Sequence, residues 1–261
     1  MTYLNQPATT EWRRYGMLPV AAALGYATSV IHIYGLGPYI EPIQEAFGWS
    51  RTQATSGLTI ATIINAVFCI AIGMLVDRIG PRLLGLAGIL LTTCAFALLG
   101  TATGENGNWY LLWCIMAFAT LPVQATIWTS AVASRFETSR GMALAVTLSG
   151  ASLAATVFPL LATWLIDSYG WRTAFAIEGA IWAAITFPMV LFFFRGARDL
   201  KPDLDSADNQ AAPEPLQLAG VSASEGLRSL VFLRLFVASV LFTFTIIALV
   251  VHFIPILTNA G

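Results

Sequence analysis

Hydrophobic residues gather in seven long runs along this chain, and short polar segments separate the first six. The runs cover approximately residues 16–40, 53–76, 83–102, 109–133, 141–166, 173–194 and 230–257. Each is long enough for a helix to cross the roughly 30 Å hydrocarbon layer of a membrane. A bilayer offers no water to backbone N–H and C=O groups, so such runs are expected to be helical. The pattern predicts an all-α integral membrane protein.

The segment between the sixth and seventh runs has a different composition. Residues 195–228 contain six acidic residues and three prolines, which is typical of a solvated linker. We therefore expect three parts: a six-helix half over 1–194, an interdomain linker over 195–228, and a seventh helix over 229–261 that begins an incomplete second half.

Composition excludes several other classes of protein. The chain is 57% hydrophobic and only 10% charged, whereas a soluble domain usually has about 25% charged residues. The net charge of -1 says nothing about nucleic-acid binding, but the sequence has no basic patch of the size that such binding needs. Cys69, Cys94 and Cys114 lie within apolar runs, where packing is the expected role. The sequence shows no metal-ligand spacing, cofactor motif or catalytic set, so we expect neither metal nor cofactor and no enzyme activity.

Basic residues indicate how the helices are oriented. If the N-terminus is cytoplasmic, ten basic residues fall on the cytoplasmic side and two, Arg51 and Arg172, on the other. The ten are Arg13, Arg14, Arg78, Arg82, Arg135, Arg140, Arg195, Arg198, Lys201 and Arg228. This positive-inside bias predicts a cytoplasmic N-terminus and a cytoplasmic linker. We expect a multi-pass protein of a bacterial-type cytoplasmic (inner) membrane.

A charged hairpin between the second and third runs carries the most specific signal. Residues 73–82 read Gly-Met-Leu-Val-Asp-Arg-Ile-Gly-Pro-Arg. Gly73 permits close helix approach, and Gly80 with Pro81 suits a tight turn. Asp77 and Arg78 lie where the chain leaves the membrane, and Arg82 lies at the same edge. These charges either form a functional ion-pair network or only anchor the topology.

Residues 73–82 fit the pattern G-x-L-x-D-R-x-G-x-R at every fixed position and resemble the 2–3 loop signature of the major facilitator superfamily. The fold implied is that superfamily's N-terminal six-helix bundle plus the first helix of the second half. The resemblance implies that Asp77 belongs to a cytoplasmic latch between two halves, supported by Arg78 and Arg82. Arg135 and Arg140 are candidate partners for Asp77 or Glu137.

Shorter stretches are similar to the monocarboxylate-porter-like and oxalate/formate branch of that superfamily. They are Phe47–Arg51, Arg140–Ala145, Gly170–Arg172 and Val251–Pro255. This resemblance implies a small organic anion as substrate, possible coupling to protons, and a missing second half that would supply a cation to the substrate site. On this interpretation the chain is truncated after helix seven.

Polar residues inside the runs are candidates for a substrate cavity, because such groups are costly within a membrane. Asn65 and Gln124 fall near mid-membrane, and Pro122 beside Gln124 could break the helix and open carbonyls toward a cavity. Tyr26 and Trp128 could line the same space or simply pack. His32 precedes a loosening Gly35-Leu-Gly-Pro stretch and either faces a pore or makes a helix contact.

Two further ionisable residues lie toward the other side of the membrane. Glu178 is either a proton site or, as we favour, the partner of Arg172. His252 near the end of the seventh run either binds or gates, or is an interface histidine. The resemblance to the superfamily thus implies a secondary transporter of a small organic anion that works by alternating access and is ion-coupled. The alternatives are a proton-coupled drug or metabolite exporter and a non-transporting membrane protein.

Overall fold

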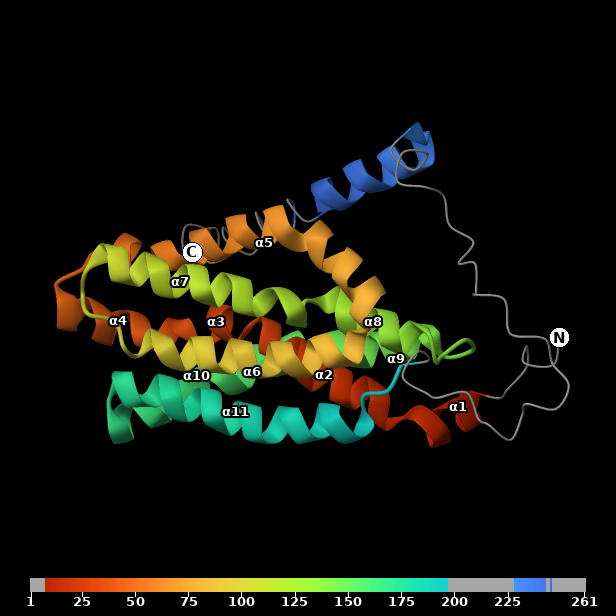
Figure 1. Cartoon of the computed structure of the whole chain (residues 1–261), viewed down its shortest axis with the longest axis horizontal. Helices are drawn as coiled ribbons and strands as arrows, with labels where there is room; N and C mark the ends of the chain where they lie inside the picture. The colour runs from red at the N-terminus through yellow and green to blue at the C-terminus, as the bar shows by residue number, and fades with distance from the viewer. Residues whose placement is uncertain (1–7, 197–227, 243–244, 246–261) are drawn as a thin grey trace, which may run out of the picture. The chain divides into compact units, whose positions relative to one another are not determined.

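The computed structural model describes residues 8–196, 228–242 and 245, apart from the side chain of Asp77. The chain divides into two units, residues 1–201 and 202–261. The first unit is built from α-helices, in which α2 to α11 run side by side along its length (Figure 1). Among the described residues, five helices are long and apolar enough to cross a membrane. The predicted all-α membrane fold is confirmed.

The helices of the first unit follow its six predicted hydrophobic runs. Helix α1 (Ala8–Tyr15) precedes the first run. The runs themselves form α2 (Met17–Ser29), α3 (Ile31–Tyr34) and α4 (Leu36–Phe47), then α5 (Arg51–Ile79), α6 (Pro81–Leu99), α7 (Asn106–Thr120), η1 (Leu121–Val123), α8 (Ala125–Ala133), α9 (Arg140–Leu148), α10 (Gly150–Tyr169) and α11 (Trp171–Phe193).

Turn chemistry explains where several spans end. Gly48 adopts a left-handed conformation with φ 67° and stops α4, and Ser50 then forms a capping box with Gln53 at the start of α5. Gly80, with φ 90°, separates α5 from α6, and Pro81 occupies the first position of α6, where its missing N–H costs nothing. The predicted turn at Gly80-Pro81 is therefore present.

The first span is longer than predicted and is broken twice. Val30 leaves helical geometry, with φ -112° and ψ 8°, and separates α2 from α3. A second boundary falls at Gly35, after which α4 continues to Phe47 rather than ending near residue 40. Pro38 lies in the first turn of α4, where its missing N–H breaks no internal bond. The breaks at Val30 and Gly35 change the direction of the helix axis and so determine which way the side chains of α4 point.

Close helix contacts in the unit depend on glycine beside large aromatic rings. A Cβ atom added to Gly57 would overlap the indole ring of Trp113. One added to Gly25 would overlap Trp128, whose side chain is fully buried. Small residues of this kind let membrane helices approach closely when no hydrophobic effect drives them together.

A buried acid fixes α1 to the turn between α8 and α9. Glu11 is only 5% exposed and accepts hydrogen bonds from the backbone N–H groups of residues 137, 138 and 139, each at 3.0 Å, and from the Ser139 hydroxyl at 2.7 Å. Burial alone would raise the pKa of Glu11, but these hydrogen bonds outweigh it and lower the pKa to about 2. The carboxylate also meets the positive end of α9.

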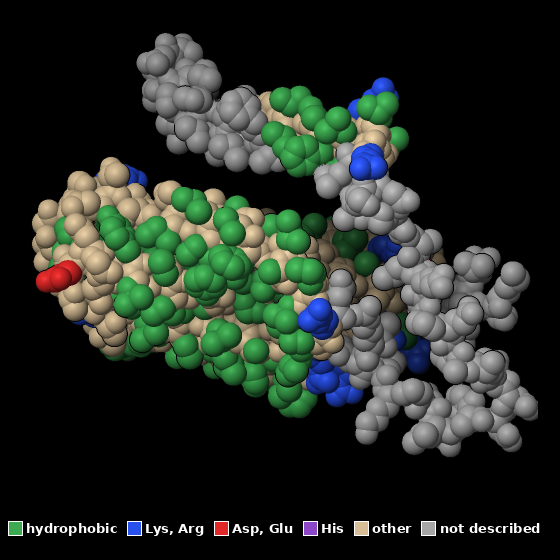
Figure 2. All heavy atoms as spheres, turned by 45° about the horizontal axis from the view of Figure 1, so that its top comes forward, with side chains coloured by type: hydrophobic (Ala, Val, Ile, Leu, Met, Phe, Trp, Pro, Cys, Tyr) green, Lys and Arg blue, Asp and Glu red, His purple; other side chains and the backbone are tan. Residues whose placement is uncertain are grey.

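Apolar side chains cover the outside of the unit, as expected of a protein in lipid. Figure 2 shows them spread along the length of the bundle, with basic side chains at its right-hand end. Helix α5 is the most exposed span, with Val67 65% and Ile70 74% exposed. In the second unit, the described helix Leu230–Phe242 is also apolar and exposed. Apart from Thr245, the rest of the predicted seventh span lies outside the described residues.

Candidate transport pathway

Two predicted cavity residues meet inside the bundle. Nε2 of Gln124 donates a hydrogen bond to Oδ1 of Asn65 at 3.0 Å. Nδ2 of Asn65 donates to Oγ1 of Thr120 at 3.4 Å and to the Ala61 carbonyl oxygen at 2.9 Å. We call Asn65, Thr120 and Gln124 the amide cluster. Asn65 and Gln124 are half-buried, so their amides keep part of their surface accessible.

A break in the fourth span places Gln124 in this cluster. The helix changes to the short 3-10 turn η1 at Pro122, and Gln124 has extended geometry, with φ -63° and ψ 158°. The predicted break is present, but two of the nearby carbonyls do not face a cavity. The Ala119 oxygen accepts from the Thr92 hydroxyl at 2.8 Å, and the Val123 oxygen accepts from the Trp128 indole at 2.7 Å. Neighbouring side chains therefore satisfy the opened backbone.

A second polar contact joins the first and sixth spans. The Tyr39 hydroxyl donates to Oε2 of Glu178 at 2.8 Å, and both side chains are fully buried. Oε1 of Glu178 has no hydrogen-bond partner among the described residues. Tyr39 also stacks on Phe175, with ring centroids 3.7 Å apart. A carboxyl in this setting has one fixed donor and one oxygen still able to bind a proton or a donor.

The expected pair between Glu178 and Arg172 does not form. The Arg172 guanidinium instead donates to the carbonyl oxygens of Gly100 at 3.1 Å and Ala102 at 2.6 Å. It also lies over the Trp171 ring, 4.3 Å from its centroid. Arg172 thus ties the start of α11 to the end of α6, because it lies at the first turn of α11 while Glu178 lies deeper in that helix.

Among the described residues, no hydrogen bond joins the other predicted cavity side chains to the amide cluster. His32 is buried, its Nδ1 has no hydrogen-bond partner among the described residues, and its ring meets Trp113 edge-on at 6.1 Å. Tyr26 is half-buried and packs against an apolar cluster that contains the fully buried Trp128. Trp128 is therefore a packing residue. His252 lies outside the described residues.

The charged hairpin is present at the junction of α5 and α6. Gly73 lies within α5, and Arg78 is exposed at its end. Arg82 donates to the Leu191 carbonyl oxygen at 2.7 Å, which ties the hairpin to the end of α11. The side chain of Asp77 lies outside the described residues.

The two arginines proposed as partners for Asp77 or Glu137 have other contacts. Arg135 donates to the Gly196 carbonyl oxygen at 2.8 Å, and Nε of Arg140 donates to the Phe136 carbonyl oxygen at 3.0 Å. The backbone N–H of Glu137 is bound by Glu11. Arg135 therefore joins the end of the fourth span to the end of the sixth.

Sequence reasoning missed Tyr39, Glu11 and Thr92 as polar partners. Tyr39 and Glu178 are separated by 139 positions and Glu11 and Ser139 by 128, so no local pattern links them. Glu11 offered a weak signal as an acid within a segment that also holds Arg13 and Arg14.

Helices of membrane length, a broken fourth span and polar contacts held inside an apolar bundle define a multi-pass helical membrane protein. Residues 22–261 match the family model of the Major Facilitator Superfamily. The chain belongs to this family.

Curated relatives are named as transport proteins. The chain is 25% identical over 134 residues to the riboflavin transporter RibJ of Trypanosoma cruzi (strain CL Brener), covering 51% of this chain and 28% of that protein. RibJ of Trypanosoma brucei brucei (strain 927/4 GUTat10.1) is 27% identical over 165 residues, with 62% and 29% covered. The agnestins efflux protein AgnL12 of Paecilomyces divaricatus is 28% identical over 184 residues, with 66% and 41% covered. The matched part of the chain spans less than half the length of each relative.

Proposed function

We propose that this chain forms part of a secondary transporter that moves a small organic solute across a membrane by alternating access. The observation that carries the proposal is the amide cluster, which joins the middle of α5 to the break in the fourth span. Buried polar side chains in a membrane are costly and typically mark a substrate pathway. Family membership and the names of the relatives support the same function.

The amide cluster suits an uncharged solute rich in hydrogen-bonding groups. Asn and Gln each present a carbonyl oxygen and an N–H₂ group, so they can both accept and donate. Within the first six hydrophobic runs of the sequence, from residues 16–40 to 173–194, the acidic or imidazole side chains are His32 and Glu178, and no lysine or arginine occurs. A flavin such as riboflavin, the solute for which two of the relatives are named, fits this chemistry.

A small organic anion is the second candidate, favoured by the resemblance of Phe47–Arg51 and Arg140–Ala145 to monocarboxylate-type porters. An anion would need a cation in the cavity, and a second half of the protein would have to provide it. We retain the division proposed from the sequence: a half over residues 1–194, a linker over 195–228, and the start of a second half over 229–261. Asp77 remains the proposed latch residue, and the N-terminus the proposed cytoplasmic end.

Glu178 is the proposed site of proton coupling. Its carboxyl lies in the membrane-spanning part of α11, is held by Tyr39, and has an oxygen without a partner among the described residues. A carboxyl can bind and release a proton during a transport cycle, and intramembrane carboxyls commonly serve this purpose.

Solute counterflow into proteoliposomes tests the proposal. The complete gene product that contains these residues is reconstituted with unlabelled solute inside, and the entry of labelled riboflavin or lactate is measured. Saturable entry of riboflavin that excess lactate does not inhibit supports a neutral solute. Saturable entry of lactate that excess riboflavin does not inhibit supports an anion. Flux equal to that of protein-free liposomes for both solutes, in a preparation that is folded and inserted, would refute transport of either class.

A further inference from the structure

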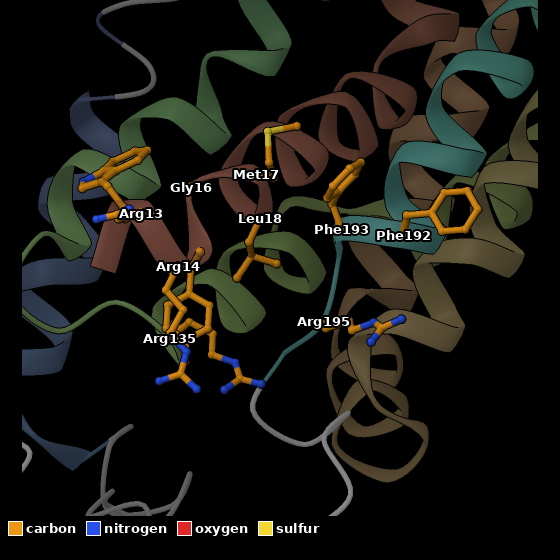
Figure 3. A pocket seen from close by; sticks show the side chains of 11 residues that line it. Arg13, Arg14, Gly16, Met17, Leu18, Arg135, Phe192, Phe193 and Arg195 are labelled. Atoms are coloured by element: carbon orange, nitrogen blue, oxygen red, sulfur yellow. The ribbon is translucent and has the colours of Figure 1, made fainter. Parts of the chain in front are cut away.

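A pocket of about 570 Å³ lies at the end of the first unit that carries the N-terminal helix. Helix α1, the start of α2, the turn after α8 and the end of α11 surround it (Figure 3). Its lining residues are Trp12, Arg13, Arg14, Tyr15, Gly16, Met17, Leu18, Arg135, Phe192, Phe193 and Arg195. None of these participates in the amide cluster or the contact between Tyr39 and Glu178.

One side of the pocket is strongly basic. The guanidinium groups of Arg14 and Arg135 both lie against the ring of Tyr15, 5.4 and 5.2 Å from its centroid. Figure 3 shows these two side chains extending in the same direction. Arg13 and Arg195 add two exposed cations, and the described residues that line the pocket include no acid. Two guanidiniums held against one ring form a site for an anion that accepts several hydrogen bonds.

The nearby acid does not neutralise this site. Glu11 is one helical turn before Tyr15, but its carboxylate accepts four hydrogen bonds from residues 137–139. Both of its oxygens are used in fixing α1 to that turn. Glu11 is therefore not the counter-ion of the arginines that line the pocket.

The other side of the pocket is apolar and lies at the membrane boundary. Met17 begins the first span, and Phe192 and Phe193 end the sixth. These side chains are 44%, 64% and 42% exposed, respectively. A free ion in water gains nothing from such a surface, whereas a lipid places acyl chains beside apolar residues and its phosphate beside cations.

We propose that this pocket binds the phosphate group of an anionic phospholipid, with Arg14 and Arg135 on the phosphate and the apolar wall along the acyl chains. Basic pockets at the ends of membrane helices recognise anionic headgroups in this way. The orientation expected from the sequence places the site in the cytoplasmic leaflet. The inference is independent of the solute transported.

The test measures binding of phosphatidylglycerol to the purified full chain in phosphatidylcholine nanodiscs, by titration with a fluorescent phosphatidylglycerol. We expect saturable binding that Arg14→Gln weakens about fivefold, because each arginine near the surface contributes about that factor. Arg135→Gln should weaken it similarly. Arg51→Gln, which removes an exposed arginine at the first position of α5, is the matched control and should change nothing. Circular dichroism and the melting temperature in phosphatidylcholine alone confirm that each variant is folded.

Two results would overturn the proposal. The first is equal binding by the wild-type protein, Arg14→Gln and Arg51→Gln, which would mean that the pocket takes no lipid. The second is displacement of the labelled lipid by millimolar inorganic phosphate with no preference for phosphatidylglycerol over phosphatidylcholine, which would make it a site for free phosphate. If Arg135→Gln fails to fold because it loses its bond to Gly196, Arg14→Gln still decides the question.

Discussion

Replacing Glu11 with alanine should loosen the attachment of α1 to the turn between α8 and α9. The carboxylate accepts four hydrogen bonds from residues 137–139 and is almost fully buried. A hydrogen bond to a charged group contributes about 1.5–3 kcal/mol, but the four share one acceptor and are not additive. Loss of a helix cap costs about 1–2 kcal/mol. We therefore expect a total loss of about 2–3 kcal/mol.

A loss of this size corresponds to a melting temperature lower by about 5–10 °C for a protein of this length. Tryptophan fluorescence is a suitable probe, because Trp12 packs against Phe136 with ring centroids 5.4 Å apart, one residue from the turn. Amide hydrogen exchange provides a local readout. The N–H groups of residues 137–139 should exchange more slowly in the wild-type protein than in Glu11→Ala.

Glu105→Ala is the matched control, since Glu105 is exposed and its side chain makes no capping bond to α7. It should change the melting temperature by no more than about 1 °C. The reasoning is refuted if Glu11→Ala melts at the same temperature as Glu105→Ala and residues 137–139 keep their wild-type exchange rates.

Three further predictions concern stability. The pKa of Glu11 is lowered from 4.5 to about 2, so its contribution to the stability of the folded protein is complete above pH 4.5 and is lost as the pH falls through about 2. Between pH 4.5 and 2, the melting temperature of the wild type should therefore fall more steeply than that of Glu11→Gln. Tyr39→Phe leaves the buried Glu178 carboxyl group without its tyrosine donor and should cost about 1–3 kcal/mol in thermal unfolding. Glu178→Gln can still accept the bond from Tyr39 and should cost less, so equal losses for the two variants would contradict this. Gly57→Ala should reduce the yield of folded protein because its Cβ would overlap an indole ring, while Gly107→Ala, which meets nothing within 4 Å, should not.

The spans of the first unit could be predicted from sequence because each is a run of apolar residues long enough to cross a membrane. The turn at Gly80 and Pro81 could also be predicted, because this pair of residues between two helical runs is typical of a tight turn. The break at Val30 could not be predicted, because a β-branched residue within an apolar run carries no local sign that the helix will stop there. That break and Gly35 redirect α4.

The polar contacts that could not be predicted from the sequence depend on how the helices pack against one another. The charge of Arg172 suggested a pair with Glu178 six positions away, yet the backbone carbonyls at the end of α6 were better placed for it. Tyr39 became the partner of Glu178 only through the packing of α4 against α11. Asn65 and Gln124 could be predicted as polar residues at mid-membrane, but their mutual hydrogen bond depends on how α5 lies against the fourth span.

The most direct test of the proposed pathway is solute counterflow through Asn65→Ala, with Thr62→Ala as the control. Thr62 lies on the same helix but is exposed, and its hydroxyl bonds the Leu58 carbonyl of its own turn at 2.8 Å. Loss of one solute hydrogen bond should lower kcat/KM for Asn65→Ala about tenfold. Thr62→Ala should match the wild type. Equal kcat/KM values for all three proteins would contradict a pathway that passes the amide cluster.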